Sequence, residues 1–188
     1  MVGHPGARIG PGCRVLDLGC GCGIPVARRL ASRHSVTGVD LSAVQIARAR
    51  ELVPSAMFIC ADMTNVDFTE QSFDAIVCLF ALIHVPLTEQ AGLLRKIRGW
   101  LRPNGVLLAT VGHQAWTGVE ENWLGVAGGD MWWSHADAAT YRRWLAAAGF
   151  LIEEERFVPE GTSGHTLVLA RRVELKPALI EFGLTSVM

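Results

Sequence analysis

A short glycine-rich segment between a buried strand and a helix constrains this chain more than any other feature. Residues 13–18 are mostly apolar and lead directly into Gly-Cys-Gly-Cys-Gly at 19–23, and a helical pattern follows over 25–32. An apolar strand without alternation is typical of a parallel sheet that is buried on both faces. Glycines at the carboxyl end of such a strand allow a sharp turn and a close approach by a ligand. The segment therefore predicts an α/β fold with a ligand-binding loop.

Apolar runs and helical patterns alternate along the rest of the chain. Strands are expected at residues 35–39, 56–60, 73–79, 106–111, 150–158 and 165–170. Helices are expected at 43–52 and 88–101, with N-caps at Ser42 and Thr88, and a further helix that opens at Ser134 or Ala136 and ends at Gly149. The last two strands are joined by a short loop, which is typical of a hairpin.

Residues 112–135 interrupt this alternation with a segment rich in tryptophan. Four of the six Trp residues of the chain lie in it. Long loops inside a compact domain are usually functional. We therefore expect an aromatic loop that takes part in ligand binding.

Length and composition exclude several classes of protein. A chain of 188 residues corresponds to about one domain, and 50% hydrophobic against 19% charged residues excludes disorder over most of its length. The net charge of −1, from 17 basic and 18 acidic residues, argues against a broad nucleic-acid surface. No apolar run approaches the roughly 20 residues of a membrane span, and the first residues lack the order of a signal peptide. We expect a cytoplasmic protein.

The five cysteines indicate free thiols in a reducing compartment. Their number is odd, and Cys20 and Cys22 have no second pair at zinc-site spacing. We therefore predict no metal site, and we expect Cys60 and Cys78 to be buried as small apolar residues.

Acidic residues end three consecutive predicted strands. Asp17 lies in the first strand, Asp40 ends the second, 21 residues after Gly19 (40 − 19), and Asp62 follows the third. The carboxyl ends of parallel strands meet at one edge of a sheet, so these acids are expected along one rim. An acid placed like Asp40 binds ribose hydroxyls, and Asp62 could accept a hydrogen bond from an adenine amine. Asp17 could instead tie its own turn.

The glycine spacing separates two classes of nucleotide-binding enzyme. Dinucleotide-binding enzymes carry G-x-G-x-x-G, whereas the sixth position counted from Gly19 is Ile24. The spacing here is G-x-G-x-G. The spacing therefore argues against a nicotinamide-dependent oxidoreductase, although this function stays an alternative.

The ordered set of motifs resembles the class I S-adenosylmethionine-dependent methyltransferases, of the small-molecule type and with a shortened N-terminus. The motifs lie at residues 15–23, 39–42, 60–63, 73–78 with His84-Val85, and 101–106. The resemblance implies a Rossmann-like, seven-stranded, mostly parallel sheet with helices on both faces and a C-terminal antiparallel hairpin. It further implies one methyltransferase domain over residues 1–171, with 112–135 as a substrate-side insertion and 172–188 as a C-terminal arm.

S-adenosyl-L-methionine is the cofactor that this resemblance implies. Its binding residues would be Asp17, Gly19, Cys20, Gly21, Asp40, Leu41, Asp62, Met63 and Leu79. The methionine part would lie on the glycine loop, with the Leu79 carbonyl near its amino group. The ribose would bind Asp40, and the adenine would lie on Leu41 with its edge at Asp62 and the Met63 backbone.

Histidines that follow the predicted strands are candidates for a general base. They are His84, His113, His135 and, at the start of the last strand, His165. Imidazole titrates near neutral pH, and a base assists when the acceptor is a hydroxyl or a protonated amine. Each of them could also have a purely structural role.

The tryptophan-rich segment supplies the candidate substrate-binding residues. These are Trp116, Trp132, Trp133 and Ser134. Flat apolar walls with a few polar groups are typical of small-molecule pockets. Packing of the segment onto the sheet is the alternative.

The sequence thus predicts an enzyme that methylates an O or N atom of a small molecule. Neither nucleic acid nor membrane is expected as a partner, and a homodimer is left open. A degenerate S-adenosylmethionine-binding domain that acts through protein contacts is an alternative, besides the oxidoreductase.

Overall fold

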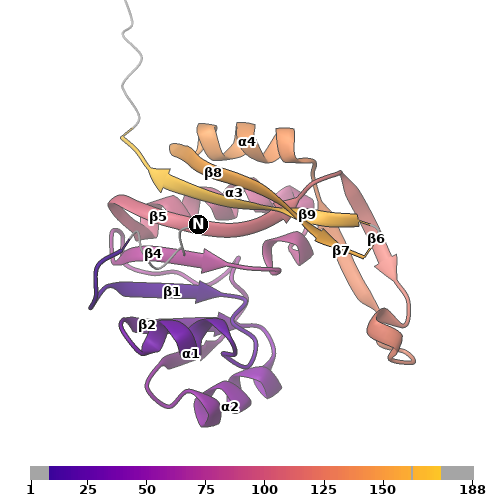
Figure 1. Cartoon of the computed structure of the whole chain (residues 1–188), viewed down its shortest axis with the longest axis horizontal. Helices are drawn as coiled ribbons and strands as arrows, with labels where there is room; N and C mark the ends of the chain where they lie inside the picture. Colours follow the sequence, from indigo (N-terminus) through magenta and orange to yellow (C-terminus); the bar gives the residue numbers. More distant parts are fainter. Residues whose placement is uncertain (1–8, 162, 175–188) are drawn as a thin grey trace, which may run out of the picture.

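A seven-stranded sheet forms the centre of the molecule (Figure 1). The computed structural model describes residues 9–161 and 163–174. The strands, in the spatial order β3-β2-β1-β4-β5-β9-β8, are β1 (Arg14–Leu18), β2 (Ser35–Asp40), β3 (Met57–Cys60), β4 (Phe73–Cys78), β5 (Leu101–Gly112), β8 (Phe150–Glu160) and β9 (Ser163–Arg172). Strands β1 to β5 pair in parallel, whereas β9 is antiparallel to both β5 and β8. The predicted fold class is confirmed.

Helices cover both faces of the sheet because neighbouring residues of a strand point to opposite sides. Val15 packs in one apolar cluster with residues of α1 (Val26–Ala31) and α2 (Ala43–Leu52). Leu16 packs in a second cluster with residues of α3 (Leu87–Trp100) and α4 (Ala138–Ala147). Both faces of the central strands are therefore buried, which explains their continuous apolar sequence.

The segment after β5 folds as a hairpin rather than as the expected loop. Strands β6 (Trp116–Glu120) and β7 (Met131–His135) form a separate two-stranded antiparallel sheet. A short 3-10 helix, η3 (Trp123–Gly125), lies between them. The hairpin stands at the end of the molecule toward which the arrows of β1 and β4 point (Figure 1). It is therefore placed beside the carboxyl edge of the sheet.

The predicted N-caps are partly wrong. Ser42 does accept a hydrogen bond from the Gln45 N–H (3.3 Å), as expected. Pro86, not Thr88, precedes α3, and no side chain caps that helix. Asp137 caps α4, because Ser134 is recruited into β7. The pairing of β7 with β6 thus delays the start of α4.

The C-terminal strands are longer than predicted. Glu160 pairs with Ser163, so the hairpin turn is tighter, and β9 continues through Arg172. Arg172 therefore belongs to the sheet rather than to a C-terminal arm. Residues 175–188 of that arm lie outside the described residues.

The cysteines are free, and the prediction for one of them was wrong. All five have a reduced thiol, and Cys78 is fully buried. Cys60 is exposed because β3 is an edge strand and Cys60 is its last residue. Burial raises the pKa of the Cys78 thiol to about 12, so this thiol is inert at neutral pH.

Candidate active site

The glycine loop after β1 is held against the end of β2. Gly19, Gly21 and Gly23 all have positive φ angles, between 53° and 77°. The Gly19 N–H donates to the Val39 carbonyl (2.8 Å), and the Gly21 N–H donates to Asp40 Oδ2 (2.8 Å). Left-handed backbone of this kind favours glycine. The loop is thus a pre-shaped turn at the topological switch point between β1 and β4, where open α/β sheets bind ligands.

Asp17 supplies an unpaired carboxyl beneath this loop. Its side chain is 3% exposed, and Oδ2 is buried without a hydrogen-bond partner among the described residues. Burial, and then the nearby charge of Asp40, raise the pKa of Asp17 to about 7. A cationic or hydrogen-bond-donating ligand group would satisfy this atom.

Asp40 and Asp62 both bind backbone groups near their own strand ends. Besides Gly21, Asp40 accepts a hydrogen bond from the Ser42 N–H at 2.9 Å. Asp62 accepts from the Thr64 N–H and hydroxyl (2.8 and 2.9 Å) and from the Asn65 amide (3.1 Å). A carboxylate has about four acceptor sites, so each acid retains capacity for a ligand.

The remaining residues predicted for the cofactor differ in exposure. Leu41 is 74% exposed, and Met63 and Leu79 are half-buried. Cys20 is buried, in the same apolar cluster as Phe58. Its backbone N–H donates to the Val39 carbonyl (3.0 Å) and its carbonyl accepts from the Gly23 N–H (2.9 Å), so Cys20 helps to hold the loop.

The chain after β4 connects the glycine loop to the tryptophan hairpin. A Cβ atom added to Gly19 would lie 2.2 Å from the Ala81 Cβ, so the two backbones are in close contact. Phe80, next to Ala81, has a φ of 52°, is 48% exposed, and lies edge-on to His165 with 6.0 Å between ring centroids. The sequence alone does not indicate this position of Phe80, because a single Phe after a strand carries no distinguishing signal.

Three imidazoles surround the Trp133 indole at this point, and we call them the imidazole cluster: His84, His135 and His165. Ring centroids lie 4.6 Å apart for His84 and Trp133, and 5.5 Å apart for His165 with each of Trp133 and His135. They come from different elements, namely η2 (Leu82–His84), β7 and β9. No group of three or more His, Cys, Asp or Glu in the described ranges could hold a metal ion.

Each Nδ1 atom of the cluster has an acceptor as its partner. The partners are the Trp132 carbonyl for His84 (2.6 Å), the Gln114 carbonyl for His135 (2.8 Å) and the Glu160 carboxylate for His165 (3.1 Å). Because these oxygens only accept, Nδ1 carries the proton and Nε2 carries the lone pair of the neutral ring. Burial lowers the pKa of His84 and of His135 below the usual value, which favours their neutral form.

The structure separates His113 from the other candidate bases. Its Nδ1 lies 3.1 Å from Thr166 Oγ1, and its ring lies 4.6 Å from that of Phe157. Thr166 and His165 are neighbours in β9, so their side chains point to opposite faces of the sheet. His113 is therefore not part of the imidazole cluster.

The four predicted substrate-binding residues also divide. Trp116 and Trp132 are 44% and 47% exposed, whereas Trp133 is buried with an unpartnered Nε1–H among the described residues. Ser134 is 2% exposed, and its hydroxyl accepts a hydrogen bond from the Leu87 N–H (3.0 Å). Ser134 thus anchors β7 to the start of α3, and its buried hydroxyl is engaged in this contact.

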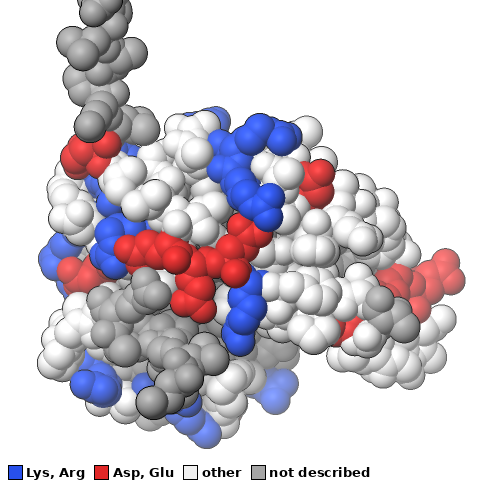
Figure 2. All heavy atoms as spheres, turned by 45° about the horizontal axis from the view of Figure 1, so that its top comes forward, with Lys and Arg blue, Asp and Glu red and all other residues white. Residues whose placement is uncertain are grey.

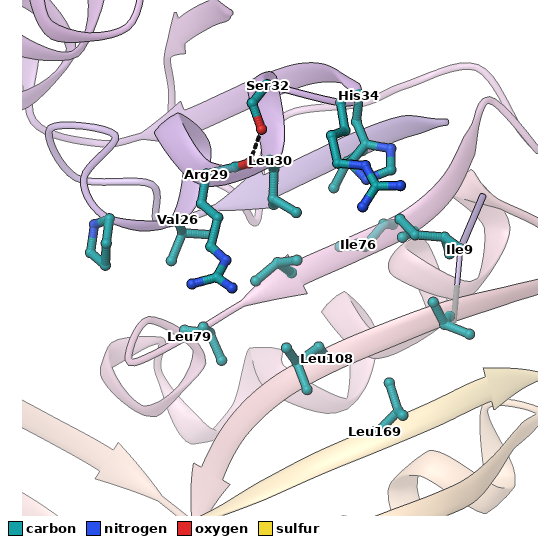
Figure 3. A pocket seen from close by; sticks show the side chains of 16 residues that line it. Ile9, Val26, Arg29, Leu30, Ser32, His34, Ile76, Leu79, Leu108 and Leu169 are labelled. Atoms are coloured by element: carbon teal, nitrogen blue, oxygen red, sulfur yellow. Dashed lines mark hydrogen bonds between the residues drawn. The ribbon is translucent and has the colours of Figure 1, made fainter. Parts of the chain in front are cut away.

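An apolar groove of about 680 Å³ lies elsewhere, on the face of the sheet beside α1. Figure 3 shows Leu108 of β5, Leu169 of β9 and Leu79, which follows β4, on one side of it, and Val26 and Leu30 of α1 on the other. Of the residues predicted for the cofactor, Leu79 alone lines it. The groove is therefore distinct from the carboxyl edge where the glycine loop and the imidazole cluster meet.

Comparison with known proteins shows that the sequence is similar to methyltransferases. The family described as methyltransferase domain matches residues 15–105. Sterol 24-C-methyltransferase of Gibberella zeae is 34% identical over 106 residues, which are 52% of this chain and 27% of that enzyme. The 2-methyl-6-phytyl-1,4-hydroquinone methyltransferase of Synechocystis is 34% identical over 55% of this chain and 33% of its own length. The chain thus matches a third or less of these two curated relatives.

A solved structure extends the similarity over most of the chain. The S-adenosylmethionine-dependent methyltransferase from Mesorhizobium loti is 26% identical, with a TM-score of 0.72, over 88% of this chain and 94% of the other. Fold, motif order and site geometry agree with these findings. The chain is thus similar to S-adenosylmethionine-dependent methyltransferases, in sequence over residues 15–105 and in fold over most of its length.

Proposed function

We propose that the protein transfers a methyl group from S-adenosyl-L-methionine to an O or N atom of a small molecule. One observation carries the proposal: Ala81 lies against Gly19, and the adjacent Phe80 lies against His165. A cofactor on the glycine loop and an acceptor at the imidazole cluster would therefore both lie next to the segment Phe80-Ala81. Methyl transfer requires such proximity, because aligning two reactants supplies much of the acceleration.

The residues at the edge of the sheet fit this cofactor. The unpartnered Oδ2 atom of Asp17 would accept a hydrogen bond from the amino group of the methionine part, or from the glycine-loop backbone that contacts this group. Asp40 retains acceptor capacity for ribose hydroxyls, and the exposed Leu41 side chain would be covered by the adenine. When bound, the cofactor supplies an activated methyl group on a sulfonium.

The chain's own part in the reaction is to bind, to orient and to accept a proton. Trp116, Trp132 and Phe80 offer exposed aromatic surface for the acceptor. Neutral imidazoles stand beside them, with their Nε2 atoms available as proton acceptors. Relatives whose names specify sterols and a hydroquinone support a small-molecule acceptor.

The charge distribution agrees with a small acceptor. On the face shown in Figure 2, acidic and basic side chains lie next to one another without a continuous basic area. None of the helices in the described part of the chain is long and apolar enough to cross a membrane. The mixed charge pattern does not favour a nucleic-acid acceptor.

The test combines calorimetry with a product assay. We expect S-adenosylhomocysteine to bind and NAD not to bind; the opposite result would refute the methyltransferase function. An acceptor screen that detects S-adenosylhomocysteine formation then separates an enzyme from a degenerate binding domain, which would bind the cofactor without turnover.

A further inference from the structure

His165 and Glu160 form a charged pair at the start of β9. His165 Nδ1 lies 3.1 Å from Glu160 Oε2. The two residues come from adjacent antiparallel strands, Glu160 from the end of β8 and His165 from β9. The imidazole is buried, whereas Glu160 is 39% exposed. The strand pairing therefore holds the carboxylate against one edge of the ring.

This pairing fixes the chemistry of the opposite edge. A carboxylate accepts hydrogen bonds only, so Nδ1 of His165 donates and Nε2 carries the lone pair of the neutral ring. Nε2 has no hydrogen-bond partner among the described residues, and it is not one of their fully buried unpartnered atoms. A group of this kind accepts a proton, and the carboxylate stabilises the cation that results.

The half-exposed Phe80 beside the ring offers aromatic surface to a planar acceptor. Trp133 stacks on His165 with an angle of 19° between the planes, and the half-exposed Phe80 lies edge-on to it. The other titratable groups that face it are His135 at 5.5 Å and His84, which interacts with it electrostatically. Burial lowers the pKa of both of these neighbours below the usual value, which favours their uncharged form.

We propose that His165 is the general base for a phenolic hydroxyl acceptor and that Glu160 is its positioning residue. The inference rests on the proposed function. The phenol oxygen attacks the sulfonium methyl carbon, and the carbon–sulfur bond breaks with its electron pair going to sulfur, which yields S-adenosylhomocysteine. The phenolic proton passes to Nε2 of His165, and the imidazolium pairs with Glu160 until it releases that proton to water.

The experiment uses the full chain, radiolabelled S-adenosylmethionine and three probes: phenol, catechol and 2-naphthol. The variants are His165→Gln, Glu160→Gln and, as a matched control, His34→Gln. His34 immediately precedes β2 and lines the apolar groove, away from the cluster. Calorimetry with S-adenosylhomocysteine accompanies every variant, so that loss of folding or of cofactor binding is recognised.

We expect His165→Gln to lower kcat by about 10²–10⁴-fold, with affinity for S-adenosylhomocysteine within twofold of the wild type. High pH should restore much of its activity, because phenolate formed in solution needs no base. Glu160→Gln should move the pH profile of kcat, and His34→Gln should match the wild type. A packing role alone would not give rescue at high pH.

Three results would overturn the proposal. They are an unchanged kcat in His165→Gln, a loss that high pH does not restore, and methylation of none of the three phenols by a protein that binds S-adenosylhomocysteine. An unaltered pH profile in Glu160→Gln would remove Glu160 from it. If the wild type fails to bind S-adenosylhomocysteine, the proposed function itself fails, and this outcome is distinct from the others.

Discussion

Gly19 and Ala81 touch across the carboxyl edge of the sheet, with no room for a side chain between them. The contact joins the loop after β1 to the loop after β4. Because Phe80 continues from Ala81 toward the imidazole cluster, the position of the glycine loop and that of the cluster depend on each other.

Gly19→Ala is expected to disturb both loops. Its φ of 74° disfavours a side chain, and the added Cβ would overlap that of Ala81. We expect a loss of about 1–3 kcal/mol in the free energy of unfolding, measured by urea denaturation, together with weaker S-adenosylhomocysteine binding. Gly21→Ala is the control: it shares a positive φ, but no atom lies within 4 Å of its Cβ position. Equal losses of unfolding free energy in the two variants would contradict the steric argument.

Asp17→Asn should change the pH dependence of stability. Burial raises the pKa of Asp17 to about 7 in the folded protein, against an ordinary value of 3.8. The folded protein therefore keeps this proton to higher pH than the unfolded chain, so the stability due to Asp17 is full below about 4 and is lost as the pH rises to about 7. The free energy of unfolding, measured by denaturation at several pH values in this range, should depend less on pH in the variant than in the wild type. An unchanged pH dependence would count against the assignment.

Asp40→Ala is predicted to weaken cofactor binding by about 1–3 kcal/mol, because a charge-assisted hydrogen bond to the ribose is lost. Asp74→Ala provides the comparison. Asp74 accepts hydrogen bonds from the Arg14 N–H and the Arg102 guanidinium at the opposite edge of the sheet, so its loss should affect stability alone. Titration calorimetry with S-adenosylhomocysteine measures the affinity of both variants. Equal affinity of Asp40→Ala and the wild type would refute the role of Asp40.

His135→Gln should reduce the acid sensitivity of the fold. Burial lowers the pKa of His135, so below about pH 6.5 the unfolded chain takes up a proton that the folded protein resists. Wild-type stability is therefore expected to fall as the pH drops below about 6.5. Thermal denaturation at several pH values checks this, and the prediction fails if the variant loses as much stability as the wild type.

Gln90→Leu should loosen the attachment of the tryptophan hairpin. The buried Gln90 amide donates to the Val85 and Ser134 carbonyls and accepts a hydrogen bond from the Tyr141 hydroxyl. Removing it leaves these groups unsatisfied, at a cost of about 1–3 kcal/mol in the free energy of unfolding. Hydrogen exchange should also rise in β7. If exchange in β7 stays at the wild-type level, Gln90 does not anchor the hairpin.

Local sequence determined the core of the fold. The apolar strands alternate with helices that have recognisable start signals, such as Ser42, and the parallel order follows because buried strands of this kind need helices on both faces. The glycine loop and the acids at the strand ends were also predictable. Their chemistry depends on their position after a strand, which short-range patterns reveal.

The tertiary structure alone decided which histidines meet in the imidazole cluster. His84, His135 and His165 are far apart in sequence and meet only because η2, β7 and β9 converge on Trp133. His113 satisfies the same strand-end pattern, yet it contacts Thr166, on the opposite face of β9 from His165. The sequence pattern cannot distinguish these histidines, because the face that a side chain occupies at a strand end depends on register and pairing with distant strands.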